Sequence, residues 1–340
     1  MKLKLSVLDQ SPVLSGMTPQ QALQSTTELV KEVEKLGYHR FWVSEHHSTK
    51  SLAGSAPEVL VAHLAANTSH IRVGTGGVLL PHYSAYKVAE VFRVLESLYP
   101  NRIDLGVGRA PGGMPNVNRA LHDGMHRDVT RYPDQLQEVI AYLKGEDPYH
   151  MRVYATPLGE TMPELWLLGS SGSSAMLASE MGAPFMFAHF INGEGGHLAA
   201  QRYREYFRPS ELSEKPQATV AVFAICAETE AEAERLAASL DLALLKLEKG
   251  EARSGFPTPE EAADYPYTMF DQARIRENRK RMVVGDPEQV KQQLIQMSEE
   301  YGAEEVMVNT ITTPFEARVK SYQLIAEAFE LTDPHQKEED

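Results

Sequence analysis

FWVSEHH (residues 41–47), VGTGGVLLP (residues 73–81) and RIDLGVGR (residues 102–109) are the stretches that decide the fold. Each is a short apolar run of strand character, and the first and the third finish in charged or ring-bearing polar residues. A strand in a parallel sheet is covered by helices on both faces, so it requires such an apolar run. Polar residues clustered at the carboxyl ends are what a parallel barrel presents to a ligand.

Apolar, strand-like runs recur along the whole chain, with helical patterns between them. Eight runs begin near Leu3, Phe41, Ile71, Ile103, Leu165, Phe185, Ala218 and Glu305. Cap residues, apolar residues at helical spacing and glycine or proline stops predict helices over residues 18–36, 84–98 and 286–301. Strands that alternate with helices indicate a parallel sheet. Eight repeats favour an α/β fold, a (β/α)8 TIM barrel with insertions, over an open sheet.

Two stretches depart from this alternation. Residues 145–163 are expected to form a loop with a short strand pair over residues 149–154. Residues 249–281 are rich in Gly, Pro and charged side chains, and long segments of this kind are either lids and binding loops or insertions without a role. We therefore expect a single barrel domain over residues 1–332 with a lid or insertion at 249–281, followed by a charged tail at 333–340.

The composition of the 340-residue chain, 42% hydrophobic and 24% charged, is that of an ordinary globular protein. No apolar stretch approaches the roughly 20 residues that cross a bilayer, and the break at residues 9–12 comes too early for a signal peptide. A net charge of −14 argues against nucleic-acid and anionic-membrane partners. The single cysteine, Cys226, lies in an apolar run, which is consistent with a reducing cytoplasm.

Glu45, His46 and His47 close the second predicted strand. Side chains alternate along a strand, so one imidazole is expected to point into the mouth of the barrel and the other away. An imidazole there can donate a hydrogen bond to an oxyanion or relay a proton near neutral pH. Metal binding is the competing interpretation. The triple lacks a helical i, i+4 pair or a Cys partner, so we expect no metal site.

Gly74, Gly76 and Gly77 fall within the third predicted strand. Glycine weakens a strand and often marks a bulge or a place where the backbone approaches a ligand closely. A flat ring system could lie against such a backbone, and a bulge without a ligand is the competing interpretation. His82 and Tyr83 follow this strand and could line the same mouth.

Arg109 ends the fourth predicted strand, and Arg119, Arg127 and Arg131 follow it. An unpaired buried guanidinium is costly, so Arg109 is expected to face the mouth, where two or more of these side chains could clamp a phosphate. The fifth strand runs into GSSGSS (residues 169–174) and then into a helix. Free N–H groups and hydroxyls at a helix start suit a phosphate, although Ser and Gly are also good helix caps. The turn is neither a Walker loop nor a Gly-x-Gly-x-x-Gly dinucleotide motif.

Taken together, these segments resemble the bacterial luciferase-like, flavin-dependent monooxygenase family. The resemblance covers nearly the whole chain and is carried by residues 45–47, 73–81, 102–109 and 168–174. It implies a (β/α)8 barrel that binds FMN at the carboxyl ends of its strands. In luciferase itself a reactive cysteine stands where this chain has Gly108, so no thiol role is carried over.

The resemblance also implies roles for individual residues. The family's catalytic histidine matches His46, and its non-proline cis peptide beneath the flavin ring matches Gly76–Gly77. The cofactor-binding residues that it implies are Thr75, Gly76, Gly77, Arg109, Arg131, Ser170, Ser171, Gly172 and Ser174.

The implied reaction uses reduced FMN and O2 to transfer one oxygen atom to a small organic substrate. NAD(P)H would supply the reducing electrons, directly or through a separate flavin reductase. The family further implies a homodimer, joined here through residues 57–66 and 86–98.

Two other functions are compatible with the sequence. One is a deazaflavin-dependent oxidoreductase, because related barrels carry that cofactor in a similar place. The other is a non-catalytic relative that binds and stores flavin. The sequence does not specify the substrate, since the residues expected to line its pocket suit many organic molecules; these are His82, Tyr83, His189 and Phe190.

Overall fold

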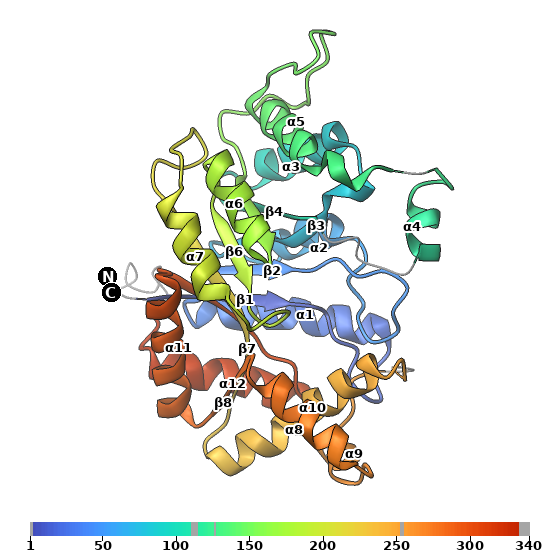
Figure 1. The fold of residues 1–340 in the computed structure, drawn as a ribbon, viewed down its shortest axis with the longest axis vertical. Coiled ribbons are helices and arrows are strands. Elements are labelled where there is room, and N and C mark those ends of the chain that lie inside the picture. Colours follow the sequence, from blue (N-terminus) through green and yellow to red (C-terminus); the bar gives the residue numbers. More distant parts are fainter. Residues whose placement is uncertain (1–2, 110–114, 126, 252–254, 333–340) are drawn as a thin grey trace.

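Within residues 3–109, 115–125, 127–251 and 255–332, which the computed structural model describes, eight parallel strands close into a barrel (Figure 1). The barrel strands are β1 (Lys4–Asp9), β2 (Arg40–Val43), β3 (Arg72–Leu79), β4 (Ile103–Gly108), β5 (Glu164–Gly169), β6 (Phe185–Ala188), β7 (Ala218–Cys226) and β9 (Glu305–Asn309). Each pairs with the next in the order β6-β5-β4-β3-β2-β1-β9-β7, and β7 pairs back to β6. The predicted TIM barrel and its eight strands are confirmed.

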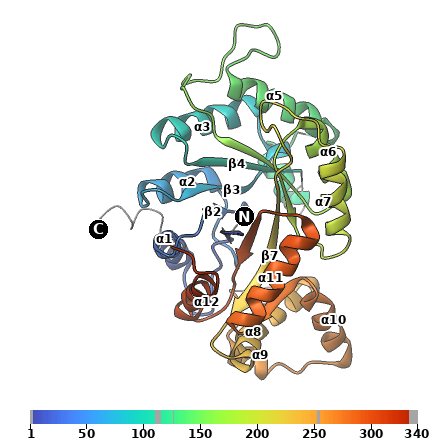
Figure 2. The same cartoon turned by 90° about the vertical axis from the view of Figure 1, so that its left-hand side faces the viewer.

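Helices follow the strands and form a layer around the barrel (Figures 1 and 2). They are α1 (Pro19–Lys35), α2 (Pro57–Ala66), α3 (Ala85–Leu98), α4 (Pro115–Leu121), α5 (Tyr132–Lys144), α6 (Gly172–Met181), α7 (Gly196–Glu205), α8 (Glu230–Glu248), α9 (Pro259–Ala263), α10 (Met269–Arg279), α11 (Pro287–Tyr301) and α12 (Phe315–Ala328), with 3-10 turns η1 (Leu80–His82) and η2 (Val129–Arg131). The three predicted helices correspond to α1, α3 and α11. Each starts at a side chain that accepts a first-turn N–H: Thr18, Ser84 or Asp286.

A ninth strand, β8 (Met282–Gly285), was not predicted from the sequence. It pairs in parallel with residues 223–226 in the carboxyl-terminal half of β7. The run is four residues long and directly follows the charged end of α10, so its apolar pattern is too short to recognise.

The strand pair expected over residues 149–154 was wrong. Asp147 instead organises a turn, because its carboxylate accepts the N–H groups of Tyr149 (3.2 Å) and Arg152 (2.5 Å). His150 and Arg152 have positive φ angles of 56° and 61°, which a continuous strand does not allow.

The described part of the 249–281 segment is helical and packs against α8. It contains α9 and α10, each of which starts with a capping box. Arg274 on α10 donates to Glu248 on α8 (2.5 and 2.9 Å), and Arg279 donates to Asp241 (2.7 Å). These elements lie at the lower end of the molecule in Figure 1. The tail predicted at 333–340 lies outside the described residues.

The barrel strands bury both of their faces. Leu8, Trp42 and Met307 belong to a cluster inside the barrel, whereas their sequence neighbours Val7 and Phe41 pack toward the helices. Side chains alternate along a strand, so burial on both faces requires a continuous apolar run. This explains why the strands were recognisable in the sequence.

A buried ionic cluster closes the amino-terminal end of the barrel. Arg40, only 4% exposed, donates to Asp104 on β4 and to Glu305 on β9, both at 2.8 Å. Arg72 and the indole N–H of Trp42 also donate to Asp104, at 2.5 and 2.8 Å. Burial by itself would raise the pKa of the Asp104 carboxyl, but the two guanidiniums outweigh it and lower that pKa.

None of the helices in the described part of the chain combines the length and the hydropathy that a bilayer crossing requires.

Replacing Asp104 with Asn should strongly destabilise the fold. Arg40 and Arg72 would stay buried with one counter-charge fewer, and breaking a buried ion pair costs about 3–5 kcal/mol. Chemical denaturation at neutral pH measures the change in the free energy of unfolding. The pKa of Asp104 is lowered on folding, so its contribution is present above the unfolded value of about 3.8 and is lost as pH falls through the lower folded value.

The control for this substitution is Glu28→Gln. Glu28 forms an exposed ion pair with Lys31, which is expected to contribute less than about 1 kcal/mol. Equal free energies of unfolding for D104N and the unmodified protein would show that the cluster does not stabilise the barrel.

Candidate functional site

A cavity of about 430 Å³, here called the rim cavity, lies at the carboxyl-terminal rim of the barrel. Its walls come from residues at or just after the ends of β1 to β6. Among the predicted site residues, those that line it are His46, Gly76, Gly77, Arg109, Ser170, Ser171 and Ser174. A closed parallel barrel brings the carboxyl ends of its strands together, so these distant segments meet here.

His46 lies half-buried in the wall of the rim cavity. Its Nδ1 is 3.1 Å from the hydroxyl oxygen of Ser44, and its backbone N–H donates to the carbonyl of Gly54 (2.8 Å). Nε2 has no hydrogen-bond partner within the described residues. Burial, with a smaller contribution from His47, lowers the pKa of His46 to about 4. The imidazole is therefore neutral near pH 7.

Glu45 ties the end of β2 to the end of β3. Its side chain is buried and accepts the N–H of Leu79 (2.8 Å) and the hydroxyl of Tyr83 (2.5 Å), and it lies 2.6 Å from His47 Nε2. Of the two adjacent histidines, His46 lines the rim cavity, whereas His47 is held by Glu45. Glu45 thus fixes the two strand ends that carry His46 and the glycines.

The glycines of β3 are required by close packing. A Cβ atom on Gly77 would lie 2.6 Å from the carbonyl oxygen of Gly106, and one on Gly76 would lie 2.7 Å from Leu8. The peptide bond between Gly76 and Gly77 is cis, as the family resemblance implied. The pairing with β4 shifts register between Thr75 and Val78, so the strand also carries the irregularity that glycine suggested.

Thr75 does not line the rim cavity. It is fully buried, and its hydroxyl donates to the carbonyl of Gly106 (2.9 Å) and accepts the N–H of the same residue (3.1 Å). These two bonds hold β3 to β4 immediately before the register shift. Thr75 therefore supports the glycine backbone from the protein side.

The serine turn and Arg109 face the same cavity from different strands. Ser171 is the N-cap residue of α6, but its side chain makes no capping hydrogen bond; it lies 3.0 Å from the hydroxyl of Ser173. Gly172, which is not part of the cavity wall, opens onto free space. Arg109 is exposed and forms no ion pair with any described residue. A cation and an uncapped helix start are thus available to an anion.

Arg131 lies outside the wall of the rim cavity. It belongs to η2, and its guanidinium donates to Glu138 (3.0 Å). Glu138 also accepts the hydroxyl of Tyr149. The sequence did not indicate this pairing, because Arg131 directly precedes α5 and Glu138 lies seven residues further on, beyond the i, i+3 and i, i+4 spacings of neighbouring helical side chains.

The expected substrate-lining residues are divided by the structure. Phe190 lines the rim cavity, whereas His189 turns away and lies 2.8 Å from the hydroxyl of Tyr301. His82 and Tyr83 line a different cavity of about 290 Å³. A position just after a strand was therefore not enough to predict which of these four side chains line the rim cavity.

Gln10 is a rim residue that the sequence reasoning missed. It directly follows β1 and lines the rim cavity. The signal that identified His46, a polar residue at the carboxyl end of a strand, was also present at Gln10. Within the described residues, no group of three or more His, Cys, Asp or Glu side chains is placed to hold a metal ion.

The protein is thus a TIM-barrel enzyme, with a candidate site in the rim cavity at the carboxyl ends of its strands. The chain belongs to the luciferase-like monooxygenase family, whose family model matches residues 3–305. It is 54% identical to the protein YwcH of Bacillus subtilis (strain 168), over 96% of this chain and 98% of that protein. It is 37% identical to the N-acetyl-S-alkylcysteine monooxygenase of the same strain, over 96% of this chain and 98% of that enzyme.

Solved structures show the same fold. The crystal structure of apo-MsnO8 has a TM-score of 0.91 and 42% identity, and the match covers 97% of this chain and 99% of that chain. An FMN complex of the oxygenating constituent of 3,6-diketocamphane monooxygenase, from Pseudomonas putida, has a TM-score of 0.71 at 19% identity (97% and 98% covered). An F420-dependent secondary alcohol dehydrogenase has a TM-score of 0.64 at 15% identity (97% and 99% covered). The last two show the shared fold alone.

His46 should remain neutral throughout the physiological pH range. Its folded pKa of about 4 lies below the ordinary value of 6.5, so the unfolded chain binds the extra proton first as pH falls. The stability that neutral His46 contributes is thus complete above pH 6.5 and is lost as pH falls toward 4. NMR titration of the ring resonances, assigned with His46→Gln, should show a midpoint near 4. A midpoint near 6.5 would mean that the ring is solvated instead.

Proposed function

We propose that this chain is an FMN-dependent monooxygenase that uses reduced flavin and O2 to oxygenate a small organic substrate. The observation that carries the proposal is the meeting of Arg109, the serine turn before α6 and His46 in one cavity. Membership of the luciferase-like monooxygenase family supports it independently. Arg109 and the turn suit a phosphate, and His46 suits proton handling, so the cavity offers both ends of a flavin site.

The phosphate end fits this group. Ser171 leaves the first turn of α6 without a side-chain cap, so the N–H groups of that turn are available to an anion. Arg109 lacks an ion-pair partner within the described residues and adds positive charge at the same cavity. We assign phosphate binding to Arg109, Ser170, Ser171, Gly172 and Ser174.

Arg131 is the less direct of the predicted phosphate contacts. Its guanidinium donates to Glu138, so it would have to leave that carboxylate to reach an anion in the rim cavity. We keep Arg131 as a proposed contact that forms only on such a rearrangement.

The ring end requires a flat surface without side chains. Gly76 and Gly77 supply it, with Thr75 holding their strand in place, and the apolar side chains of Leu168 and Met186 line the same cavity. Reduced FMN, when bound, would supply the electrons that activation of O2 requires. The protein's part is to orient the ring and to keep water from it.

We propose His46 as the catalytic residue. The hydroxyl of Ser44 holds Nδ1, which leaves Nε2 to hold or move a proton in the cavity. The lowered pKa keeps the free ring neutral, so its Nε2 can donate or accept a hydrogen bond, according to the tautomer, without bringing a permanent charge into the site.

We also propose that 249–281 is a cover on a single barrel domain. Gly255, Phe256, Pro257 and Arg281 line a second cavity that shares His46 with the rim cavity. A cover in this place would help to exclude water from the reaction.

Two substitutions test the flavin site. Arg109→Met should weaken the binding of FMN roughly tenfold or more, because a charge-assisted hydrogen bond contributes about 1.5–3 kcal/mol. The binding of riboflavin, which lacks the phosphate, should not change. His46→Ala should retain FMN and lower oxygen transfer roughly a hundredfold. Flavin fluorescence measures the binding. Incorporation of isotopically labelled O2 into N-acetyl-S-alkylcysteines, with a flavin reductase supplying reduced FMN, measures the transfer.

The control for R109M is Arg276→Met, since Arg276 lies on α10, outside the rim cavity. Arg131→Met reports on the other proposed contact. If R109M loses as much affinity for riboflavin as for FMN, the result would argue against a phosphate site. Tighter binding of F420 than of FMN would favour the deazaflavin-dependent oxidoreductase, and FMN binding without any oxygen transfer would favour a flavin-storing relative.

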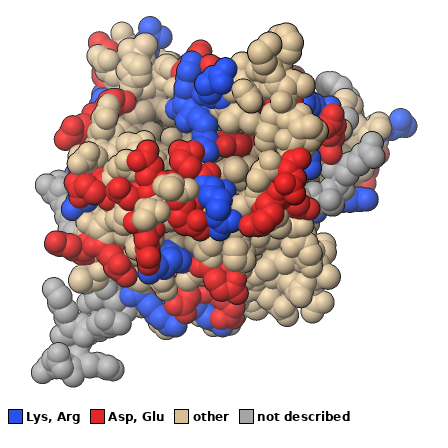
Figure 3. All heavy atoms as spheres, turned by 90° about the horizontal axis from the view of Figure 1, so that it is seen from below, with Lys and Arg blue, Asp and Glu red and all other residues tan. Residues whose placement is uncertain are grey.

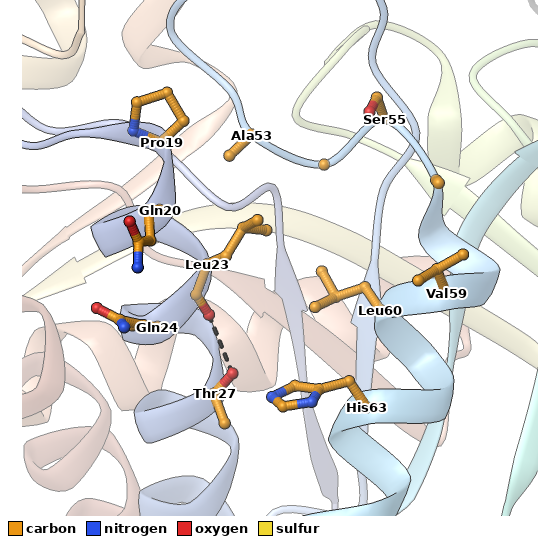
Figure 4. A pocket seen from close by; sticks show the side chains of 12 residues that line it. Pro19, Gln20, Leu23, Gln24, Thr27, Ala53, Ser55, Val59, Leu60 and His63 are labelled. Atoms are coloured by element: carbon orange, nitrogen blue, oxygen red, sulfur yellow. Dashed lines mark hydrogen bonds between the residues drawn. The ribbon is translucent and has the colours of Figure 1, made fainter.

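We propose in addition that two copies associate through α2 and α3. Val59 on α2 is 66% exposed, and Val94 and Leu98 on α3 are 45% and 62% exposed. Val59 also lines a groove of about 690 Å³ between α1 and α2, with the side chains of Leu23 and Leu60 directed into it (Figure 4). Apolar side chains exposed on neighbouring helices suit a protein partner.

Val59→Glu combined with Leu98→Glu should shift the protein toward monomer, with a dissociation constant raised roughly tenfold or more, because charges would enter an apolar contact. Sedimentation equilibrium measures this dissociation constant. Phe270→Glu is the control, since Phe270 is 86% exposed on α10. An unchanged dissociation constant for the double variant would place the contact elsewhere.

We further propose a cytoplasmic location. Cys226, the only cysteine of the chain, is a buried free thiol. Burial raises its pKa to about 12, so it stays a protonated core residue, as suits a reducing compartment.

A further inference from the structure

A second cavity of about 350 Å³, here called the α8 cavity, adjoins the rim cavity. The two share four lining residues, Gln10, His46, Phe190 and Ile191. The outer wall of the α8 cavity comes from α8 and from the 255–257 segment. A molecule in the α8 cavity would therefore lie against His46, on the side away from the serine turn.

Most of the wall of the α8 cavity is apolar. Side chains that contribute to it include Leu52, Phe190, Phe223, Leu240, Leu244 and Phe256. A volume of about 350 Å³ has room for on the order of ten groups of the size of a water molecule. The cavity thus fits a small molecule with a largely apolar body.

The permanent charges in this wall all have one sign. Lys246 and Arg281 line the α8 cavity, and no Asp or Glu within the described residues does. This contrasts with the chain as a whole, whose net charge is −14. Figure 3 shows acidic side chains spread over the lower face of the molecule, with basic ones between them. A cation-lined cavity in an acidic protein favours an anionic ligand.

Lys246 has no carboxylate partner within the described residues. Its ammonium lies over the ring of Tyr265, with Nζ 5.7 Å from the ring centroid. Lys249, one turn further along, instead forms an ion pair with Asp271 at 2.7 Å. Lys246 is thus the lysine of this helix end whose charge is available to a ligand.

The charge of Arg281 is only partly compensated. Its guanidinium donates to the carbonyls of Phe190 (3.2 Å) and Ile191 (2.9 Å), which fixes the wall shared by the two cavities. The nearest carboxylate, that of Glu248, is 3.6 Å away and is already bound by Arg274 at 2.5 and 2.9 Å.

We propose, resting on the function proposed above, that the α8 cavity holds the organic substrate and that this substrate is an amphipathic acid. Its apolar body would lie among the leucines and phenylalanines, and its carboxylate or similar anionic group would be held by Lys246 with support from Arg281. The reacting atom would then lie beside His46 at the junction of the two cavities. An amine is disfavoured because the wall offers it no carboxylate.

Three probes of one chain length test the charge preference: octanoate, 1-octanol and octylamine. Calorimetric titration of the FMN-saturated protein should find octanoate bound most tightly and octylamine most weakly. Lys246→Met keeps most of the apolar stem. It should lower the affinity for octanoate roughly five- to tenfold and change the affinity for 1-octanol less than about twofold. Lys249→Met is the matched control and should leave all three affinities unchanged.

A second substitution tests the place of binding. Ala243→Phe would fill the α8 cavity and should weaken the binding of both octanoate and 1-octanol. FMN, held in the rim cavity, should bind as before. Octanoate that binds no more tightly than octylamine, or that responds equally to K246M and K249M, would overturn the proposal. Undiminished octanoate binding in A243F would also overturn it.

The titrations are repeated without FMN to separate the two proposals. Failure of FMN to bind would count against the flavin function alone, because the octanoate comparison is complete in either series.

Discussion

The ionic cluster at the closed end of the barrel is the constraint on which the rest of the structure depends. Arg40, Asp104 and Glu305 come from three different strands, and each needs the others because a buried charge without its partner is costly. A shift of one strand along another would break these pairs. The cluster therefore fixes the register of β2, β4 and β9 at one end, and through it the alignment of the strand ends at the other.

The two ends of the barrel consequently have different tasks. At the amino-terminal end, the guanidiniums of Arg40 and Arg72 are bound by the carboxylates of Asp104 and Glu305. At the carboxyl-terminal rim, Arg109 lacks a counter-charge within the described residues and Ser171 makes no capping bond. A partly uncompensated site of this kind is less stable than a satisfied one, and the rigid barrel beneath it supports that cost.

Glu45 links the two levels. Its carboxylate holds the end of β3 and the side chains of Tyr83 and His47, so His46 is positioned between a fixed strand and the cavity. The alternation of side chains along a strand predicted that only one of the two histidines would face the mouth, and the family resemblance pointed to His46. The structure gives its members different roles: Glu45 supports, His47 is its partner, and His46 faces the cavity.

The amino-acid sequence by itself determined the barrel, because burial on both faces of each strand forces apolar runs that can be read directly, and β8 escaped only because four residues carry too little pattern. It also indicated part of the rim, since polar groups after a buried strand, such as Arg109 and Ser170, have few other places to lie. Only the tertiary structure decided which of these residues meet. Arg131 pairs with Glu138, Thr75 binds the backbone of Gly106, and Lys246 lines a cavity beside His46. These outcomes depend on distances between segments far apart in the chain, and local patterns do not encode such distances.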